Sequence, residues 1–432
     1  MSTVPAPTSA ASSSEAGNYR LPLAILTTLF FMWGFLTCLN DILIPHLKAA
    51  FSLSYTQAAL IQFSFFTAYF LVSLPSGAIV QKLGYQRGIV IGLITAGLGC
   101  VLFYPAAATR SYPLFLGALF VLASGITLLQ VSANPYVAIL GKPETASSRL
   151  TLTQAFNSLG TFLAPYFGAA LILATVERGA DELARMAPAD VVAYKAAEAS
   201  SVQVPYVGLA LVLVLIAAVM AVIKLPAIRG GDAPGTDAGH LEDRGSAWRY
   251  PHLVLGGVAI FVYVGGEVSI GSFLVNFMKL PEIADLPEKA GSLYLPLFWG
   301  GAMVGRFIGA ALLRRVRPGY LLAFNAAVAA TLAMLTMVLG GHAAMYAILA
   351  VGFFNSIMFP TIFTLALDGL GRHTEQGSGV LCMAIVGGAL VPVAMGALAD
   401  TVGIHHAFFL PALCYVFIVY YGVWGSRHAA RA

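Results

Sequence analysis

The sequence predicts an all-α membrane protein with twelve transmembrane helices, arranged as two six-helix halves with pseudo-twofold symmetry. Of its 432 residues, 59% are hydrophobic and 10% are charged, whereas soluble domains carry about 25% charged residues. Apolar stretches of about 20 residues, which is the length that crosses a bilayer, recur along the chain. A polar segment divides these stretches six and six. This pattern excludes an ordinary soluble enzyme.

Each expected helix is an apolar run bounded by polar loops, and the Pro and Gly residues inside several of them are tolerated in membrane helices. The first six runs cover residues 21–46, 56–80, 88–107, 113–140, 150–173 and 204–225. The second six runs cover residues 250–277, 291–313, 318–339, 343–367, 375–398 and 404–424.

The polar segments define the organisation of the chain. Residues 1–20 lack the basic and apolar regions of a cleavable signal peptide and are expected to form a disordered cytoplasmic tail. The N-terminal half covers 21–225, the Gly- and Asp-rich cytoplasmic linker 226–249, and the C-terminal half 250–424. Residues 425–432 form a second cytoplasmic tail.

Charge indicates orientation rather than a macromolecular partner. Lys and Arg are more frequent in the loops that share a side with both termini, which predicts that this side and both termini are cytoplasmic. The net charge of +4 includes no basic block typical of nucleic-acid binding. The four cysteines lie in apolar stretches without metal-ligand spacing, so we expect no metal and no cofactor. The expected partners are the bilayer and a small substrate, and the expected state is a monomer.

Two carboxylates lie deep inside apolar segments, Asp41 in the first expected helix and Glu267 in the seventh. An ionised carboxylate at the bilayer centre costs roughly 2.5–3.5 kcal/mol on insertion scales, so such residues usually have a function. Apart from Arg306, the apolar parts of the expected helices contain no basic residue. Neither acid therefore has an evident permanent partner, and both are predicted to load and release a proton.

Amides form the second polar class within the helices. Sugar hydroxyls need paired donors and acceptors, so amides that converge with Asp41 would suit a sugar, whereas hydrogen bonding between helices is the alternative interpretation. Trp33 could stack on a sugar or anchor the helix at the membrane interface. The candidate substrate-binding residues are Trp33, Asp41, Gln62, Gln130, Asn134, Gln154, Asn157, Glu267, Asn276 and Asn355.

The two halves resemble each other in sequence. A Gly-x-x-x-x-Lys/Arg loop follows the second and the eighth helix, and a polar residue five positions before a proline recurs in the fourth and the tenth. Parallel repeats of this kind are typical of transporters that rock one half against the other. The corresponding loop residues, predicted to act in gating, are Gly77 and Lys82, and Gly309 and Arg314.

Several motifs follow one another from the first helix to the tenth: Leu39–Pro45, Gln57–Gln62, Ala133–Tyr136, Arg149–Ser158, Ser201–Tyr206 and Phe359–Phe363. In this order they resemble the fucose–galactose–glucose:proton symporter family of the major facilitator superfamily. The resemblance implies proton-driven sugar uptake across a bacterial inner membrane. It also implies that Asn40 contacts sugar and that Gln154 and Asn157 face the central cavity.

One departure from the fucose permeases concerns the second carboxylate. Those proteins carry a Glu in the fourth helix where this chain has Gln130, and they lack an acid at the position of Glu267. The stretch around Glu267 resembles the glucose/galactose and N-acetylglucosamine branches of the family. We therefore expect Glu267 to replace the missing acid and to face Asp41 across the substrate path.

The sequence thus predicts an importer of a hexose or N-acetylhexosamine that works by proton symport and alternating access. Sodium coupling remains an alternative, because carboxylate and amide oxygens suit either cation. A polytopic membrane enzyme acting on lipid-linked sugars is a rival, although no loop holds a His/Asp/Glu cluster with ligand spacing. A receptor or channel without coupled transport is a further rival.

Overall fold

The computed structural model describes residues 19–51, 55–109, 111–172, 185–187, 189–191, 193–194, 203–226 and 245–427, and no side chains within 39–59 or 168–172. The described residues are helical or lie in turns and connections, with no strand among them. Both expected tails fall mainly outside this range, as does most of the expected linker 226–249. The all-α prediction is confirmed.

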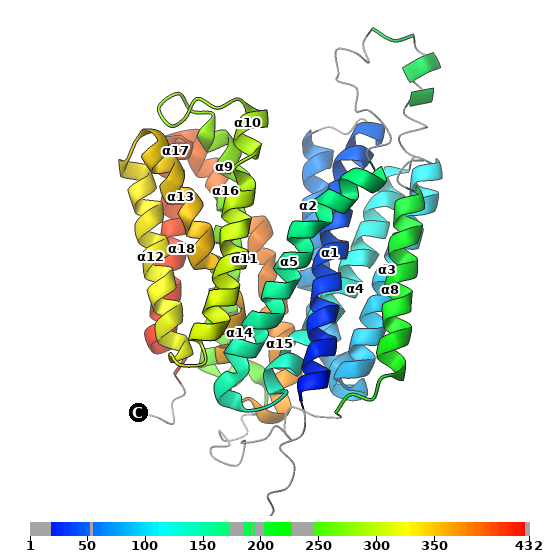
Figure 1. Cartoon of the computed structure of the whole chain (residues 1–432), viewed down its shortest axis with the longest axis vertical. Helices are drawn as coiled ribbons and strands as arrows, with labels where there is room; N and C mark the ends of the chain where they lie inside the picture. Colours follow the sequence, from blue (N-terminus) through cyan, green and yellow to red (C-terminus); the bar gives the residue numbers. More distant parts are fainter. Residues whose placement is uncertain are drawn as a thin grey trace, which may run out of the picture.

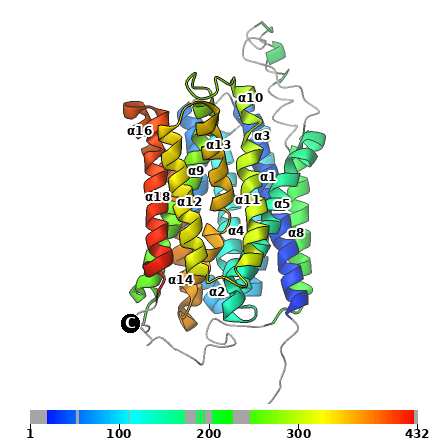
Figure 2. The ribbon, with the colours of Figure 1, turned by 60° about the vertical axis from the view of Figure 1, so that its left-hand side comes forward.

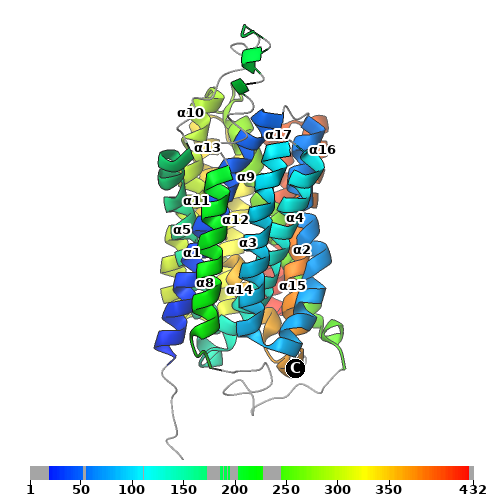
Figure 3. The same cartoon turned by 90° about the vertical axis from the view of Figure 1, so that its right-hand side faces the viewer.

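Six long helices form the N-terminal half: α1 (Arg20–Phe51), α2 (Tyr55–Leu83), α3 (Tyr85–Thr109), α4 (Tyr112–Ile139), α5 (Ala146–Ile172) and α8 (Gln203–Val222). Within it, α3 packs against both α4 and α8, and α1 packs along α5. Figure 3 shows this half from the outside, with α3 and α8 in front. Glycines permit the close approaches: a Cβ at Gly125 of α4 would lie 2.2 Å from the backbone nitrogen of Ala96 in α3.

Long helices and shorter helical pieces together form the C-terminal half: α9 (Pro251–Met278), α10 (Glu288–Ser292), α11 (Leu295–Leu312), α12 (Pro318–Val338), α13 (Gly341–Asn355), α14 (Met358–Leu367), α15 (Thr374–Met383), α16 (Gly387–Val402), α17 (Ile404–Ala407) and α18 (Phe409–Tyr420). A π-helical turn at Tyr421–Gly425 continues α18. Several of these pieces align end to end into single crossings, as α13 and α14 do (Figure 2).

Among the described residues, eleven helical stretches are long and apolar enough to cross a membrane. A further helix, α5, is 27 residues long and packs in the bundle like the others. Its sequence carries Ser147, Arg149, Gln154 and Asn157 among other polar residues, which lowers its hydropathy. Together with α5, the structure has the twelve crossings that the sequence predicts.

The two halves approach each other at one end of the molecule, where α14, α15 and the start of α5 lie, and diverge toward α10 and α17 (Figure 1). Across this end α2 packs on α15, and α5 packs on α11 and α14. The start of α1 and the turn that follows α18, close to the two described ends of the chain, lie at the same end of the bundle. The contacts between the halves are therefore concentrated on the side of the termini.

Candidate functional site

Glu267 occupies the middle of α9, where it is partly buried. The hydroxyl of Tyr263, one helical turn earlier, donates a hydrogen bond of 2.8 Å to Glu267 Oε1. The same hydroxyl can also donate to the backbone carbonyl oxygen of Asn355, which is 3.2 Å away. Glu267 is thus held to its own helix and connected, through one tyrosine, to the end of α13.

The end of α13 is a helix break inside a membrane crossing. Residues 356 and 357 separate α13 from α14, and breaks of this kind expose backbone groups that need other partners. Arg306 of α11 donates through Nε to the carbonyl oxygen of Ser356, 3.1 Å away. The Asn355 side chain is fully buried and faces the Tyr415 hydroxyl of α18.

Arg306 also reaches the other half. Its Nη1 donates to the hydroxyl of Ser158 in α5. The guanidinium interacts electrostatically with Glu267 and Tyr263, although Arg306 and Glu267, both of which are described, form no direct ion pair. Helix packing thus brings Arg306 of α11 near Glu267 of α9, but Glu267 has no ion-pair partner among the described residues.

A second polar cluster lies within the N-terminal half and joins α2, α4 and α5. Gln154 donates through Nε2 to Asn134 Oδ1 at 3.3 Å, and both side chains are buried. Gln130, one turn before Asn134 in α4, donates to the Tyr69 hydroxyl at 2.6 Å. The structure thus brings together three of the predicted substrate-binding amides, and Asn134 Nδ2 has no hydrogen-bond partner among the described residues.

Asn157 occupies a different position from Gln154, although both lie on α5. Its Nδ2 donates to the carbonyl oxygen of Phe30 in α1 at 2.9 Å. A Cβ at Gly34 of α1 would lie 2.1 Å from the Asn157 carbonyl oxygen, so the two backbones are in close contact there. The amide of Asn157 therefore contributes to the seam between α1 and α5.

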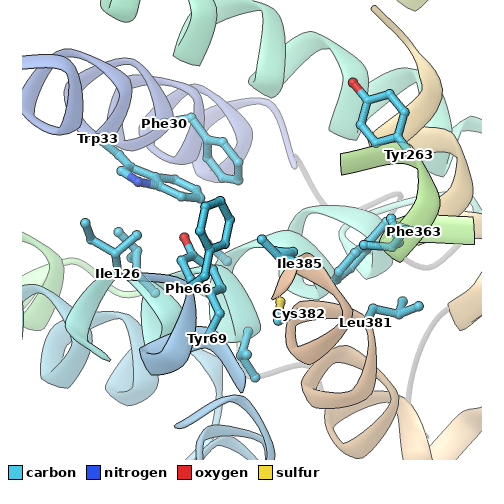
Figure 4. Packing of buried hydrophobic residues seen from close by; sticks show 14 of the residues in the cluster. Phe30, Trp33, Phe66, Tyr69, Ile126, Tyr263, Phe363, Leu381, Cys382 and Ile385 are labelled. Atoms are coloured by element: carbon cyan, nitrogen blue, oxygen red, sulfur yellow. The ribbon is translucent and has the colours of Figure 1, made fainter. Parts of the chain in front are cut away.

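Trp33 is 8% exposed and packs against Phe30, with ring centroids 5.3 Å apart. It lines a small apolar cavity between α1, α3, α4 and α8, together with Leu93, Ile126 and Leu209. Figure 4 shows Trp33 and Phe30 beside Ile126, with Phe66 and Tyr69 of α2 between them and the C-terminal half. The surroundings of Trp33 in this structure are apolar.

The remaining predicted residues are spread over the molecule. Gln62 and Asn276 are exposed, and Asn276 borders an open depression with Ser272 and Glu288. Asn40 and Asp41 lie on α1, and their side chains are outside the described residues. The expected approach of Asp41 to Glu267 is therefore still a prediction.

The predicted gating residues lie where the halves meet. A Cβ at Gly77 would lie 2.8 Å from the carbonyl oxygen of Glu375 at the start of α15. A Cβ at Gly309 would lie 2.1 Å from Ile357 Cγ2, next to the helix break. The basic partners Lys82 and Arg314 are exposed at the ends of their helices.

Sequence reasoning missed the hydroxyls that join the halves. The Ser147 and Thr364 hydroxyl oxygens are 2.6 Å apart. Ser148 donates to the Ala310 carbonyl oxygen at 2.6 Å, and Ser378 donates to the Val131 carbonyl oxygen at 2.9 Å. The only signal in the sequence is that each serine is a small polar residue near the start of a membrane helix.

Comparison with known proteins gives these contacts a context. The family model of the Major Facilitator Superfamily matches residues 24–384. The chain is 58% identical to the glucose/galactose transporter of Brucella abortus biovar 1 (strain 9-941), covering 96% of both chains. It is 36% identical to the L-fucose-proton symporter of Escherichia coli K12, covering 97% of this chain and 96% of the relative.

The fold agrees with this relationship. The crystal structure of the transporter FucP in the outward conformation superposes with a TM-score of 0.87 at 36% identity, covering 95% of this chain and 99% of that one. The family model, the two relatives and the two-half architecture lead to one conclusion. The chain belongs to the major facilitator superfamily, in the family that contains the glucose/galactose transporters and L-fucose–proton symporters.

Proposed function

We propose that this protein imports a hexose, with glucose and galactose as the first candidates, by proton symport through alternating access. The observation that carries the proposal is the Glu267 carboxylate inside α9, bound to Tyr263 and connected to a helix break. An acid placed within a membrane crossing is expensive unless it handles a cation or a substrate. The name of the 58% identical relative supports the choice of sugars.

The arrangement of the two halves supports alternating access. Three hydrogen bonds between serines and the opposite half close the end that carries the termini. If this end is cytoplasmic, as the distribution of basic residues predicts, the structure represents an outward-facing state. The protein would then lie in a bacterial inner membrane with both termini inside, and would act as a monomer.

Sugar recognition is assigned to the amides of the N-terminal half. Gln130, Asn134 and Gln154 form one cluster, and Asn134 Nδ2 is free for a ligand hydroxyl within the described surroundings. Asn40 and Asp41 would complete the site from α1. Amides supply both donors and acceptors, which matches a ring of hydroxyl groups.

Membership in a family of transporters removes the membrane-enzyme alternative. It leaves the coupling cation open, and we propose the proton with sodium as the alternative. A proton that crosses 100 mV supplies about 2.3 kcal/mol, enough to concentrate a sugar on the order of tens of times. N-acetylhexosamines remain a second substrate class.

Uptake by purified protein in liposomes tests the proposal. Labelled glucose should accumulate when an inward proton gradient is imposed, and a sodium gradient alone should not drive it. Competition by a panel of hexoses and N-acetylhexosamines would rank the substrates. Accumulation that follows sodium and ignores the proton gradient would contradict proton coupling, and failure of every hexose to compete would contradict the substrate class.

Glu267→Gln separates coupling from binding in the same assay. Counterflow needs only sugar binding and alternating access, so it should continue, whereas proton-driven accumulation should be lost. Normal accumulation by this variant would place coupling elsewhere. Loss of counterflow as well would make Glu267 a sugar ligand.

A further inference from the structure

Arg306 is a cation inside the membrane-crossing part of α11, and it contacts groups on both sides of the boundary between the halves. Its partners are the Ser158 hydroxyl of α5 in the N-terminal half and the Ser356 carbonyl of the helix break in its own half. A guanidinium keeps its charge in proteins, so it needs acceptors in every state of the transport cycle.

These contacts behave differently when the halves move. Ser356 and Glu267 belong to the same half as Arg306, so they travel with it. Ser158 belongs to the other half, and the contact between α5 and α11 lies on the side where the halves are closed. Opening that side therefore separates Arg306 from Ser158 and leaves the guanidinium short of one acceptor.

Glu267 is the acid that can take the place of Ser158. It already interacts electrostatically with Arg306. The other polar groups facing Glu267 are the hydroxyls of Tyr263 on its own helix and Tyr415 on α18, and neither carries a positive charge. Arginine and carboxylate groups form strong paired hydrogen bonds when they meet.

We propose that Arg306 is a coupling residue that exchanges Ser158 for Glu267 when the halves open at the end that carries the termini. The Glu267 carboxyl then gives its proton to water on that side, and the resulting carboxylate pairs with the Arg306 guanidinium. Re-closing returns Arg306 to Ser158 and leaves Glu267 ready to be protonated from the other side. This inference rests on the proposed proton-coupled function and names the residue that links the proton to the movement.

The test compares Arg306→Gln with Arg306→Lys in liposomes, with Arg317→Gln as the matched control at an exposed arginine near the start of α12. Counterflow does not require proton release, so Arg306→Gln should keep it. Net efflux and proton-driven accumulation both require release, and they should fall about tenfold or more, which corresponds to ~1.4 kcal/mol. Arg306→Lys should recover part of both, since it restores the charge.

The outcomes are distinguishable. If Arg306→Gln accumulates sugar like the wild type while Glu267→Gln does not, the inference about Arg306 is wrong and the proposed function stands. If Glu267→Gln itself accumulates normally, the coupling role of Glu267 fails and this inference fails with it. If Arg306→Gln loses counterflow and sugar binding together, Arg306 has a structural role and the proposal is overturned.

Discussion

Of the four serines with a hydrogen bond across the boundary between the halves, the three other than Ser158 should control the conformational equilibrium of the transporter. Each donates or shares a hydrogen bond across the boundary, and they are Ser147, Ser148 and Ser378. A hydrogen bond of this kind is worth about 0.5–1.5 kcal/mol net. Replacing all three with alanine should therefore destabilise the closed end by ~3 kcal/mol, which is about a 100-fold shift toward the state that is open there.

The partners left behind do not add a large penalty. Thr364, the partner of Ser147, already contacts the Pro360 and Thr361 carbonyl oxygens. The acceptors of the other two serines are backbone carbonyls that belong to α4 and α11. The triple variant should fold, because each alanine fits in the space of the serine that it replaces.

Spin-label distances would measure the shift, in a background without the native cysteines. Val204 of α8 and Val338 of α12 are 79% and 83% exposed at the end away from the termini. Val222 and Val316 are exposed at the opposite end. In the triple variant the first distance should shorten and the second should lengthen.

Ser124→Ala is the matched control, because the Ser124 hydroxyl contacts Phe120 of its own helix α4. It should leave both distance distributions unchanged. Wild-type distributions in the triple variant, with and without sugar, would refute the reasoning. They would mean that packing of α2 and α5 against the other half, and not these hydroxyls, closes this end.

Three further predictions follow from single contacts. Gln154→Ala should lower sugar affinity several-fold without preventing membrane insertion, since one hydrogen bond to a buried ligand is worth about 0.5–1.5 kcal/mol. If the purified variant binds sugar with unchanged affinity, the Gln154 amide serves helix packing through Asn134 and does not bind sugar. Tyr263→Phe removes the hydrogen-bond donor to Glu267 and should reduce accumulation more than counterflow. Equal loss of accumulation and counterflow would contradict a role of this hydrogen bond in proton coupling. Gly77→Val should abolish transport, because the larger side chain prevents the close packing of α2 on α15. A fully active variant would show that transport does not require this close contact.

The crossings were predictable from the sequence because the bilayer demands about 20 apolar residues per helix. The position of Glu267 inside a membrane crossing was predictable for the same reason, since its charge is conspicuous in an apolar run. Its hydrogen bond to Tyr263 could also be inferred, because residues four apart share a helix face. An interruption of the tenth crossing was expected from its Pro and Gly residues, whereas the position of the break, at residues 356 and 357, was not.

Contacts between distant residues could not be predicted in this way. The bond from Arg306 to Ser158 joins residues far apart in sequence and depends on how α11 leans against α5. The separation of Gln154 from Asn157 depends in the same way on where α1 crosses α5. Hydropathy and helical periodicity describe one helix at a time, so they contain no information about these crossings.

The polarity of α5 has a consequence for how the protein is made. Insertion of a segment into the bilayer from the translocon depends on its own hydrophobicity, and α5 is less apolar than α4 and α8, the long helices that precede and follow it. The preceding helix, α4, is 28 residues long and strongly apolar. We therefore expect α5 to enter the membrane from the translocon as a hairpin with α4. A shortened or more polar α4 should then prevent both helices from inserting during biosynthesis.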